Sequence, residues 1–364
     1  QEHGIRSASI FYDTIPWQLS RIYPGAYGDA HKQYMLTLAH YDTVVAISEY
    51  ARSDFARLVS EFGGEAKRVT AVNLAAEFAG SKRGAKSFGE ASPSVNVLVV
   101  GTVEPRKNHE LLIRAFARAQ ATCTNELQLT IVGREDTLDP GLAGRVRQAV
   151  QKLPGARWIV AADDRELTAL YEAADFTVFP STEEGFGLPI LESLWTGTPC
   201  ICANFGAMAE VADGGGCFPV DVTDEEALAS AISELADDAE LRRTLSAAAA
   251  VRRFRSWTDY VNEIWPLVIG TQNHPHVEEA RLTRLAIPSK RPLLSVCITT
   301  YNRAGWLGAA LKNLERVWPI SDDDVEISGE KRLRRGTALQ QNMRDSGDAR
   351  NDPQMDPFVR DPAA

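Results

Sequence analysis

The feature that most constrains the fold is a regular alternation, from about residue 96 onward, of short β-branched runs with segments of helical pattern. Such an alternation is typical of a parallel sheet covered by helices. We therefore predict a doubly wound α/β domain over residues 93–270, with a ligand site beyond the carboxyl ends of its strands. The expected strands are 96–100, 128–132, 158–160, 176–179 and 199–203, and the first helix is expected over 110–119.

Residues 1–92 contain a second and shorter set of βα units. The expected order is a strand ending near Tyr12, a helix over 31–40, a strand over 43–47, a helix over 49–62 and a strand over 68–72. So few units would bury both faces of a parallel sheet poorly. We therefore expect a partial Rossmann-like domain that lacks strands on its N-terminal side.

The rest of the chain divides into three parts. Residues 271–291 are polar and contain several prolines, as expected of a linker. Residues 292–320 begin with a strand-like run, a turn and a helical pattern, like the start of a third α/β domain. Residues 321–364 are rich in Asp, Arg, Gly and Asn and poor in apolar residues. Such a composition cannot bury enough apolar surface to fold, so we expect a disordered tail.

Composition and charge argue against several classes of protein. The chain has 39 Lys and Arg against 49 Asp and Glu, a net charge of -10, which disfavours a nucleic-acid partner. The five cysteines are odd in number and lack metal-ligand spacing, so we expect reduced thiols in a cytoplasmic protein without a bound metal. No apolar run reaches the ~20 residues of a membrane-spanning helix. The basic run of Arg252, Arg253 and Arg255 is either a solvated face or a peripheral contact with anionic lipid at the inner face of the membrane.

The most informative segment is 181–193 (STEEGFGLPILES), which directly follows an expected strand. Gly185 and Gly187 allow a tight turn and a close approach of the backbone to a ligand, and Pro189 suits the first turn of a helix. The amino end of that helix would point into the predicted cleft. Its free N–H groups and its dipole favour an anionic group such as a phosphate.

Charged side chains of both signs follow two of the expected strands. Glu184 in the loop and Glu192 in the early helix could line one pocket, or both could be solvated surface groups. The segment 101–108 (GTVEPRKN) places Arg106 and Lys107 at the same end of the sheet. Taken alone, such a basic pair is more often a solvated helix start than a ligand site. Because it shares that end of the sheet with the glycine loop, we interpret it as a clamp for a diphosphate.

Several sequence motifs occur together in this chain. Over about residues 8–270 they give it a resemblance to the retaining glycosyltransferases of group 1, also called glycosyltransferase family 4. The resemblance implies the GT-B fold, which consists of two Rossmann-like domains with a cleft between them. The blocks that carry it are GTVEPRKN, HELLIRAF, LTIVG, ELTALYEAADFTVFPS, EEGFGLPILESLWTGTPCICAN and GAMAEVA.

The resemblance also implies roles for individual residues. Glu184 would contact the donor sugar near the reacting carbon, and Glu192 would bind the ribose hydroxyls of the nucleotide. Arg106 and Lys107 would hold the diphosphate leaving group, so that these two residues and Glu184 form the catalytic set. The remaining donor-binding residues would be Gly101, Thr102, Gly185, Phe186, Gly187 and Leu188.

Two positions depart from the family pattern. Thr102 stands where the family often has an arginine, so Arg106 and Lys107 would carry more of the phosphate charge. The segment FYDTIP resembles an acceptor-side loop of the family, but Tyr12 stands where many members have histidine. Asp13 is either a residue that orients the acceptor hydroxyl or a turn cap. Ser48 and Glu49 match another family block and are first interpreted as the start of a helix.

The implied activity is transfer of a sugar from a nucleotide diphosphate sugar, with GDP-mannose as our first choice, to a glycan or a lipid-linked acceptor. The resemblance implies retention of configuration, no cofactor and no divalent metal, in surface polysaccharide biosynthesis. Two alternatives stay open: a sugar-nucleotide epimerase of the same architecture, and an inactive nucleotide-binding fragment or scaffold. An oxidoreductase is disfavoured because no G-x-G-x-x-G follows the first strand of the 93–270 domain.

A separate resemblance concerns 294–314, which is similar to the opening of family 2 glycosyltransferases. The matching residues are Thr300, Tyr301, Asn302 and Arg303. The acidic run 322–324 is either a metal-binding motif or a solvated charge run, and we favour the second because no strand precedes it. The sequence does not indicate an oligomeric state.

Overall fold

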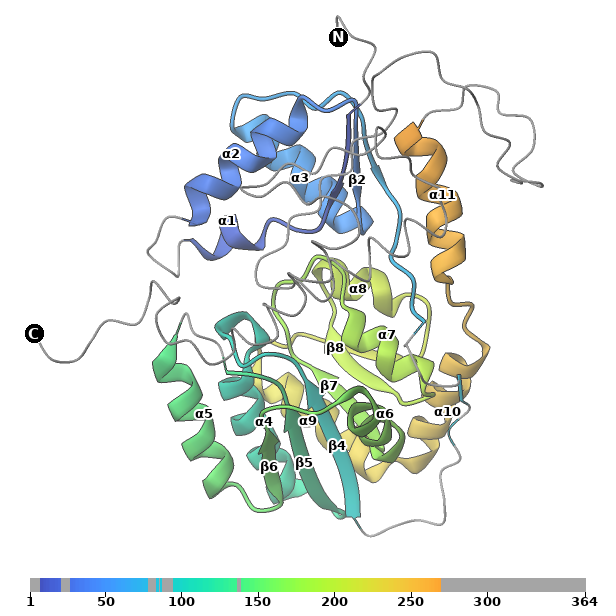
Figure 1. Ribbon diagram of the computed structural model, residues 1–364. Helices are drawn as coiled ribbons and strands as arrows, with labels where there is room; N and C mark the ends of the chain where they lie inside the picture. Colours follow the sequence, from blue (N-terminus) through green and yellow to red (C-terminus); the bar gives the residue numbers. More distant parts are fainter. Residues whose placement is uncertain are drawn as a thin grey trace, which may run out of the picture. The chain divides into compact units, whose positions relative to one another are not determined.

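The computed structural model describes residues 7–20, 27–77, 83–84, 86, 94–135 and 139–269, which all belong to one compact unit over 6–273. Their strands form two parallel sheets, one of three strands and one of six (Figure 1). The predicted α/β class is therefore confirmed. The expected linker 271–291, the third α/β start at 292–320 and the disordered tail 321–364 lie outside the described residues.

The six-stranded sheet has the strand order β6-β5-β4-β7-β8-β9. Its order reverses between β4 and β7, because the chain first builds outward from β4 to β5 and β6 and then returns to the other side of β4. In open α/β sheets a ligand binds at this switch point, beyond the carboxyl ends of the two strands. The strands are β4 (Ser94–Val100), β5 (Glu126–Val132), β6 (Ala156–Ile159), β7 (Phe176–Phe179), β8 (Cys200–Ala203) and β9 (Cys217–Val220).

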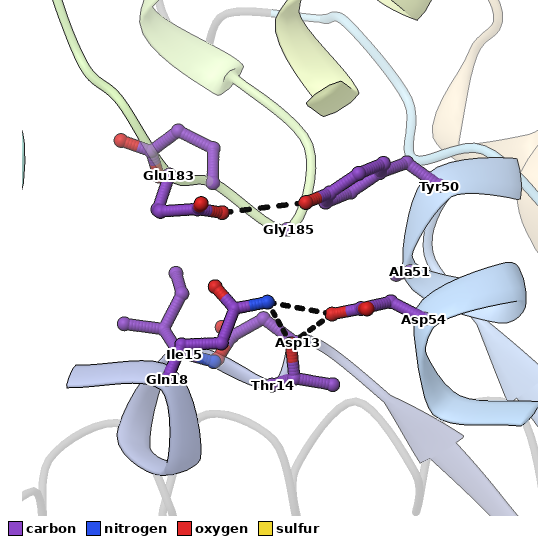
Figure 2. A pocket seen from close by; sticks show the side chains of 10 residues that line it. Asp13, Thr14, Ile15, Gln18, Tyr50, Ala51, Asp54, Glu183 and Gly185 are labelled. Carbon is purple, nitrogen blue, oxygen red and sulfur yellow. Dashed lines mark hydrogen bonds between the residues drawn. The ribbon is translucent and has the colours of Figure 1, made fainter. Parts of the chain in front are cut away.

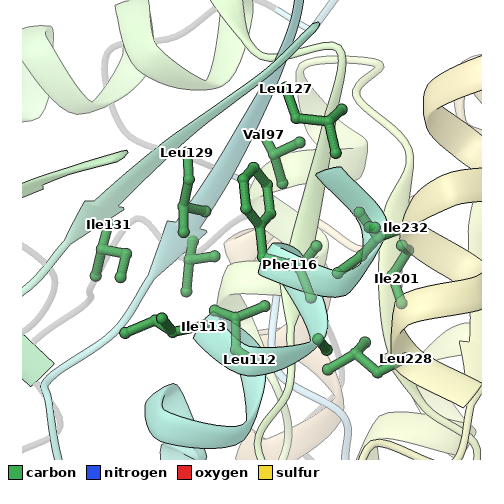
Figure 3. Close-up of a cluster of buried hydrophobic side chains, with 14 of the residues drawn as sticks. Val97, Leu112, Ile113, Phe116, Leu127, Leu129, Ile131, Ile201, Leu228 and Ile232 are labelled. Atoms are coloured by element: carbon green, nitrogen blue, oxygen red, sulfur yellow. The ribbon is translucent and has the colours of Figure 1, made fainter. Parts of the chain in front are cut away.

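Helices cover this sheet on both faces, which explains why its strands are almost continuously apolar. Along β4, Val97 and Val99 belong to the core on one face, whereas Leu98 belongs to the core on the other. Figure 3 shows the first of these cores, in which Phe116 lies among aliphatic side chains of the strands and helices. The helices are α4 (His109–Thr122), α5 (Pro140–Lys152), α6 (Asp164–Ala173), α7 (Leu188–Trp195), α8 (Gly206–Ala212), α9 (Glu225–Asp237) and α10 (Ala239–Val251).

The three-stranded sheet pairs its strands in the order β1-β2-β3, all parallel. On one face, Phe11, Met35 and Phe55 are fully buried between the sheet and its helices. On the other face, Tyr260 near the end of the described chain packs on Val45, so α11 covers that face. The elements are β1 (Ala8–Phe11), α1 (Ile15–Leu19), α2 (Tyr27–Ala39), β2 (Thr43–Ala46), α3 (Glu49–Glu61), β3 (Val69–Ala71) and α11 (Trp257–Ile269).

The sequence patterns located these elements closely. The strand expected over 96–100 lies inside β4, and 176–179 matches β7. The strand expected over 158–160 is found at Ala156–Ile159, because its pairing with β5 begins at Ala156 opposite Leu129. Among the described helices, none has the length and apolar character needed to cross a membrane.

Candidate functional site at the strand switch point

Two loops leave the sheet at the switch point, one after β4 and one after β7. The first turns through a short 3₁₀ helix, Pro105–Lys107, and Asn108 then takes a left-handed conformation before α4 begins. The second ends at Gly187, whose φ of 118° is the left-handed region that favours glycine, and Pro189 occupies the first turn of α7 as predicted. Both loops therefore stand at the edge where a doubly wound sheet binds its ligand.

The two loops are joined by hydrogen bonds that involve the backbone. The Thr182 N–H donates to the Arg106 carbonyl over 2.8 Å, and Arg106 Nη1 donates to the Glu183 carbonyl over 2.8 Å. Arg106 thus both supports the second loop and presents its guanidinium to it. The loops form one structural unit, although 77 residues separate Arg106 from Glu183 in the sequence.

Arg106, Lys107 and Glu184 form a buried ion cluster, which is named here the cation–Glu184 cluster. Arg106 Nη1 lies 2.6 Å from Glu184 Oε1, and Lys107 Nζ forms an ion pair with the same oxygen. Ser181 Oγ donates to that oxygen over 2.7 Å, and Arg106 also pairs with Glu104 over 2.6 Å. The three predicted catalytic residues are therefore in contact. In this structure, however, both cations are neutralised by carboxylates.

Burial and charge together set the protonation of this cluster. Burial by itself would raise the pKa of Glu184, but the charges of Lys107 and Arg106 hold that pKa below its ordinary value. Burial lowers the pKa of Lys107, with Glu184 opposing the shift. The Lys107 ammonium also lies 4.7 Å from the centre of the Phe179 ring, a cation–π contact. An anion that enters here would compete with Glu184 for two desolvated cations.

Glu192 lies on α7 and is held by a different partner. The Tyr171 hydroxyl, from α6, donates to Glu192 Oε2 over 2.8 Å. Burial raises the pKa of Glu192, and the Tyr171 hydrogen bond opposes that shift. The sequence motifs pointed to Glu192 but not to Tyr171. Tyr171 lies in the ELTALYEAADFTVFPS motif, in the last turn of the helix that precedes β7, and this position was the signal that could have indicated it.

The loop after β7 also contacts the three-stranded sheet. Ser48 Oγ, at the start of α3, donates to the Gly185 carbonyl over 2.6 Å. The Tyr50 hydroxyl donates to Glu183 Oε2 over 3.3 Å, as Figure 2 shows. A Cβ atom on Gly185 would overlap the backbone carbonyl oxygen of Tyr12. Gly185 is therefore required for close packing against the loop after β1.

A carboxylate from the six-stranded half caps a helix of the three-stranded half. Glu210 on α8 accepts hydrogen bonds from the Glu49 N–H over 3.1 Å and the Tyr50 N–H over 3.0 Å. Asn73 Nδ2 donates to the same carboxylate over 3.1 Å. An acidic group at a helix N-terminus satisfies free donors and is stabilised by the helix dipole. The predicted cap by Ser48 is also present, because its side chain accepts from the Ala51 N–H.

The other predicted site residues occupy varied environments. Asp13 accepts the Ile15 N–H over 3.0 Å, the geometry of a turn cap, and burial raises the pKa of its carboxyl. Tyr12 is 58% exposed, and Leu188 is 39% exposed at the start of α7. Phe186 is buried in the core beside α7, so only its backbone is available to a ligand. Gly101 and Thr102 lie in the turn directly after β4.

Comparison with known proteins places these features in a family context. Residues 83–252 match the family described as "Glycosyl transferases group 1". This part of the chain matches the group 1 glycosyltransferases. It is 29% identical over 225 residues to O-antigen chain mannosyltransferase B of Escherichia coli, covering 59% of this chain and 57% of that protein.

A second relative, D-inositol 3-phosphate glycosyltransferase of Acidothermus cellulolyticus, is 31% identical over 258 residues, 66% of this chain and 57% of the relative. The chain thus spans about half the length of the curated relatives it matches.

Solved structures share the fold at low sequence identity. Anabaena HepE, solved in complex with UDP and glucose, aligns with a TM-score of 0.57 and 18% identity over 71% of each chain. Sucrose-phosphate synthase from Thermosynechococcus elongatus aligns with a TM-score of 0.57 and 20% identity, over 71% of this chain and 66% of that one. The GT-B fold predicted from the sequence motifs is confirmed by these likenesses.

Proposed function

We propose that this protein is a retaining hexosyltransferase, which transfers a sugar from a nucleotide diphosphate sugar to a hydroxyl group of a glycan or lipid-linked acceptor. The observation that carries the proposal is the cation–Glu184 cluster at the switch point, beside the amino end of α7. Two desolvated cations and a helix N-terminus provide an anion site, and the carboxylates Glu184 and Glu192 flank it. A diphosphate with a sugar on one side and a ribose on the other fits that charge pattern.

In the proposed transfer reaction, opposite charges develop on the sugar ring and on the leaving diphosphate. When the bond between the sugar C1 and the diphosphate oxygen breaks, negative charge collects on the phosphate and positive charge on the sugar ring. Arg106, Lys107 and the first turn of α7 would stabilise the phosphate charge. The acceptor oxygen would form the new bond to C1 on the face that the phosphate leaves, and its proton would pass to the departing phosphate.

Glu184 would change partners when the donor binds. In this structure the Glu184 carboxylate forms an ion pair with both cations of the cluster. An incoming diphosphate carries more negative charge and would replace Glu184 on Arg106 and Lys107. The released carboxylate would then face the sugar, where it can bind a hydroxyl and stabilise positive charge on the ring. The mechanism requires no divalent cation, since the protein supplies the positive charge itself.

We choose GDP-mannose as the first donor to test, followed by UDP-sugars, and surface polysaccharide biosynthesis as the process. The similarity to an E. coli protein named O-antigen chain mannosyltransferase B supports this choice. We also propose that the reaction takes place in the cytoplasm. The four described cysteines, Cys123, Cys200, Cys202 and Cys217, are free thiols, which a reducing compartment favours.

Calorimetric titration of the full chain with GDP, UDP and ADP, with and without magnesium, tests the donor site. We expect one nucleotide to bind in both conditions and to bind at least about tenfold more weakly to Glu192→Ala, since the ribose would lose a charged partner. Glu240→Ala, on the exposed surface of α10, is the matched control. Failure of all three nucleotides to bind, or equal binding to both variants, would contradict the proposal.

Product analysis then separates transfer from the alternatives. Incubation with the matching nucleotide sugar should release the free nucleoside diphosphate and a glycoside with unchanged anomeric configuration. An epimerase would instead return a nucleotide sugar of altered stereochemistry, and a scaffold would bind the nucleotide without turnover.

A further inference from the structure

The start of α3, in the three-stranded half of the molecule, is bound by two separate segments of the six-stranded half. Glu210 on α8 accepts the backbone N–H groups of Glu49 and Tyr50 over 3.1 and 3.0 Å. The loop after β7 accepts from a side chain of the same turn, because Ser48 Oγ donates to the Gly185 carbonyl over 2.6 Å. The turn therefore joins a carboxylate on one element to the donor-site loop on another.

The first three N–H groups of α3 all have partners, and Glu210 supplies two of these. A helix leaves its first four backbone donors without a partner inside the helix. Glu210 accepts the first two, and Ser48 Oγ accepts the third, from Ala51, over 2.9 Å. The helix dipole also favours a carboxylate at this end. Asn73 Nδ2 donates to Glu210 over 3.1 Å, so the carboxylate holds a second segment of the three-stranded half.

The Ser48 hydroxyl connects this arrangement to the loop that carries Glu184. Its oxygen accepts the Ala51 N–H, and its single proton is donated to the Gly185 carbonyl. Ser48 is fully buried, and a Cβ atom on Gly185 would overlap the Tyr12 carbonyl oxygen. The contact is therefore closely packed from both sides. The position of the first turn of α3 consequently constrains the backbone next to Glu184.

Glu184 is the residue of the proposed mechanism that this constraint affects. Its carboxylate oxygen binds Arg106, Lys107 and Ser181 in this structure, and in the proposed reaction it would face the sugar. A displacement of about 1 Å at a reacting centre can lower a rate ~100-fold. A change in the packing of α3 would therefore lower turnover. Nucleotide binding would persist, because the two cations and Glu192 belong to the six-stranded half.

We propose that Glu210 is a positioning residue for sugar transfer, which holds the start of α3 so that Ser48 keeps the Gly185 carbonyl, and with it Glu184, in place. The inference rests on the proposed transferase function and adds a residue on α8 to it. Glu210 acts through α3 and the loop after β7 rather than by contact with a substrate. A glutamate that only capped a helix would instead contribute to stability and leave turnover unchanged.

Transfer kinetics and nucleotide titration of Glu210→Ala and Asp237→Ala test the proposal. Asp237 is the matched control, because it also accepts two backbone N–H groups and an asparagine side chain, from Thr124 and Asn125. These donors directly precede β5, at the edge of the sheet opposite to the donor site. Glu210→Ala should lower kcat at least about tenfold and leave the nucleotide Kd within about twofold. Asp237→Ala should keep both values within about twofold of the wild type.

Two further changes test whether Glu210 acts through Ser48. Ser48→Gly removes the hydroxyl at a position where glycine is tolerated as a helix cap, and it should also lower kcat at least about tenfold. The double variant Glu210→Ala with Ser48→Gly should be at most about twofold slower than the slower single variant, because the two residues act in series. Glu210→Gln keeps one acceptor oxygen and should recover at least about threefold of the kcat lost in Glu210→Ala.

Hydrogen exchange followed by mass spectrometry provides a readout that does not depend on turnover. Backbone exchange over 183–187 should be at least about threefold faster in Glu210→Ala than in the wild type or Asp237→Ala. Equal exchange in the three proteins would overturn this inference. So would equal losses of kcat in Glu210→Ala and Asp237→Ala, a parallel loss of nucleotide binding in Glu210→Ala, or effects of Glu210→Ala and Ser48→Gly that multiply.

A wild-type chain that binds nucleotide but transfers no sugar would instead overturn the proposed function. The exchange measurement would still decide whether Glu210 controls the loop after β7, so the two failures can be told apart.

Discussion

His109, directly after the basic loop, is a buried base without a visible partner, and its replacement by leucine should make the fold more resistant to acid. The side chain is 2% exposed at the start of α4, and neither ring nitrogen forms a hydrogen bond with a described residue. Burial, and secondarily the charge of Lys107, lowers the pKa of His109 from 6.5 to about 3. The imidazole is therefore neutral in the folded chain at pH 7.

The size of the effect follows from proton linkage. The unfolded chain binds a proton at His109 near pH 6.5, whereas the folded chain binds it only near pH 3. Between these values the unfolded state holds more protons, so the free energy of unfolding falls as the pH falls. At pH 5, 1.5 units below the unfolded pKa, His109 alone should cost about 2 kcal/mol relative to pH 7.5, at 1.36 kcal/mol per unit.

Urea unfolding of the wild type and of His109→Leu at pH 7.5 and pH 5 measures this term. The variant should be as stable as the wild type or more stable at pH 7.5, because two unpaired polar atoms are removed from the core. Its advantage should grow by about 2 kcal/mol at pH 5. His40→Leu, at an exposed position after α2, is the matched control. If the stabilities of wild type and His109→Leu fell in parallel between the two pH values, the reasoning about His109 would be refuted.

Three further predictions concern the donor site. Lys107→Ala should lower turnover ~100-fold, the scale of one lost charge-stabilising donor, and unchanged turnover in a steady-state assay would remove Lys107 from the mechanism. Tyr171→Phe should weaken nucleotide binding severalfold, and the loss should grow as the pH falls, because Glu192 loses a hydrogen bond that lowers its pKa. Nucleotide titrations between pH 8 and pH 6 measure this trend, and its absence would contradict the prediction. Gly185→Ala should lower the rate of transfer at least about tenfold and destabilise the fold by about 1 to 3 kcal/mol, since its Cβ would overlap the Tyr12 carbonyl oxygen. If the variant kept the melting temperature and the activity of the wild type, the loop would be able to move aside and the prediction would be wrong.

The order of helices and strands was predictable because its signals are local. A strand buried on both faces has a continuous run of apolar residues. The strand expected over 96–100 lies inside β4, two residues from its start, and the strand expected over 176–179 matches β7. Turn and cap chemistry is equally local, so the roles of Gly187, Pro189 and Ser48 in starting helices followed from residue type alone. The edge of the sheet that carries the site followed from the alternation of elements.

The composition of the site was predictable only in part. The sequence motifs pointed to Arg106, Lys107 and Glu184, and these three residues are in contact. They did not indicate that Glu184 forms ion pairs with both cations, nor that the Tyr171 hydroxyl donates to Glu192. Pairing of this kind depends on the orientation of side chains across two loops, and no periodicity in either loop records it.

By itself, the amino-acid sequence determined the α/β architecture, the position of the glycine loop and the residue types available to bind a diphosphate. These properties depend on interactions between residues a few positions apart, such as strand alternation, helix caps and tight turns. Only the tertiary structure decided that Ser48 reaches Gly185 across 137 positions, and that Glu210 accepts the backbone N–H groups at the start of α3. The physical reason is that such contacts depend on how the two sheets pack together, and packing depends on the shapes of both surfaces rather than on any local pattern.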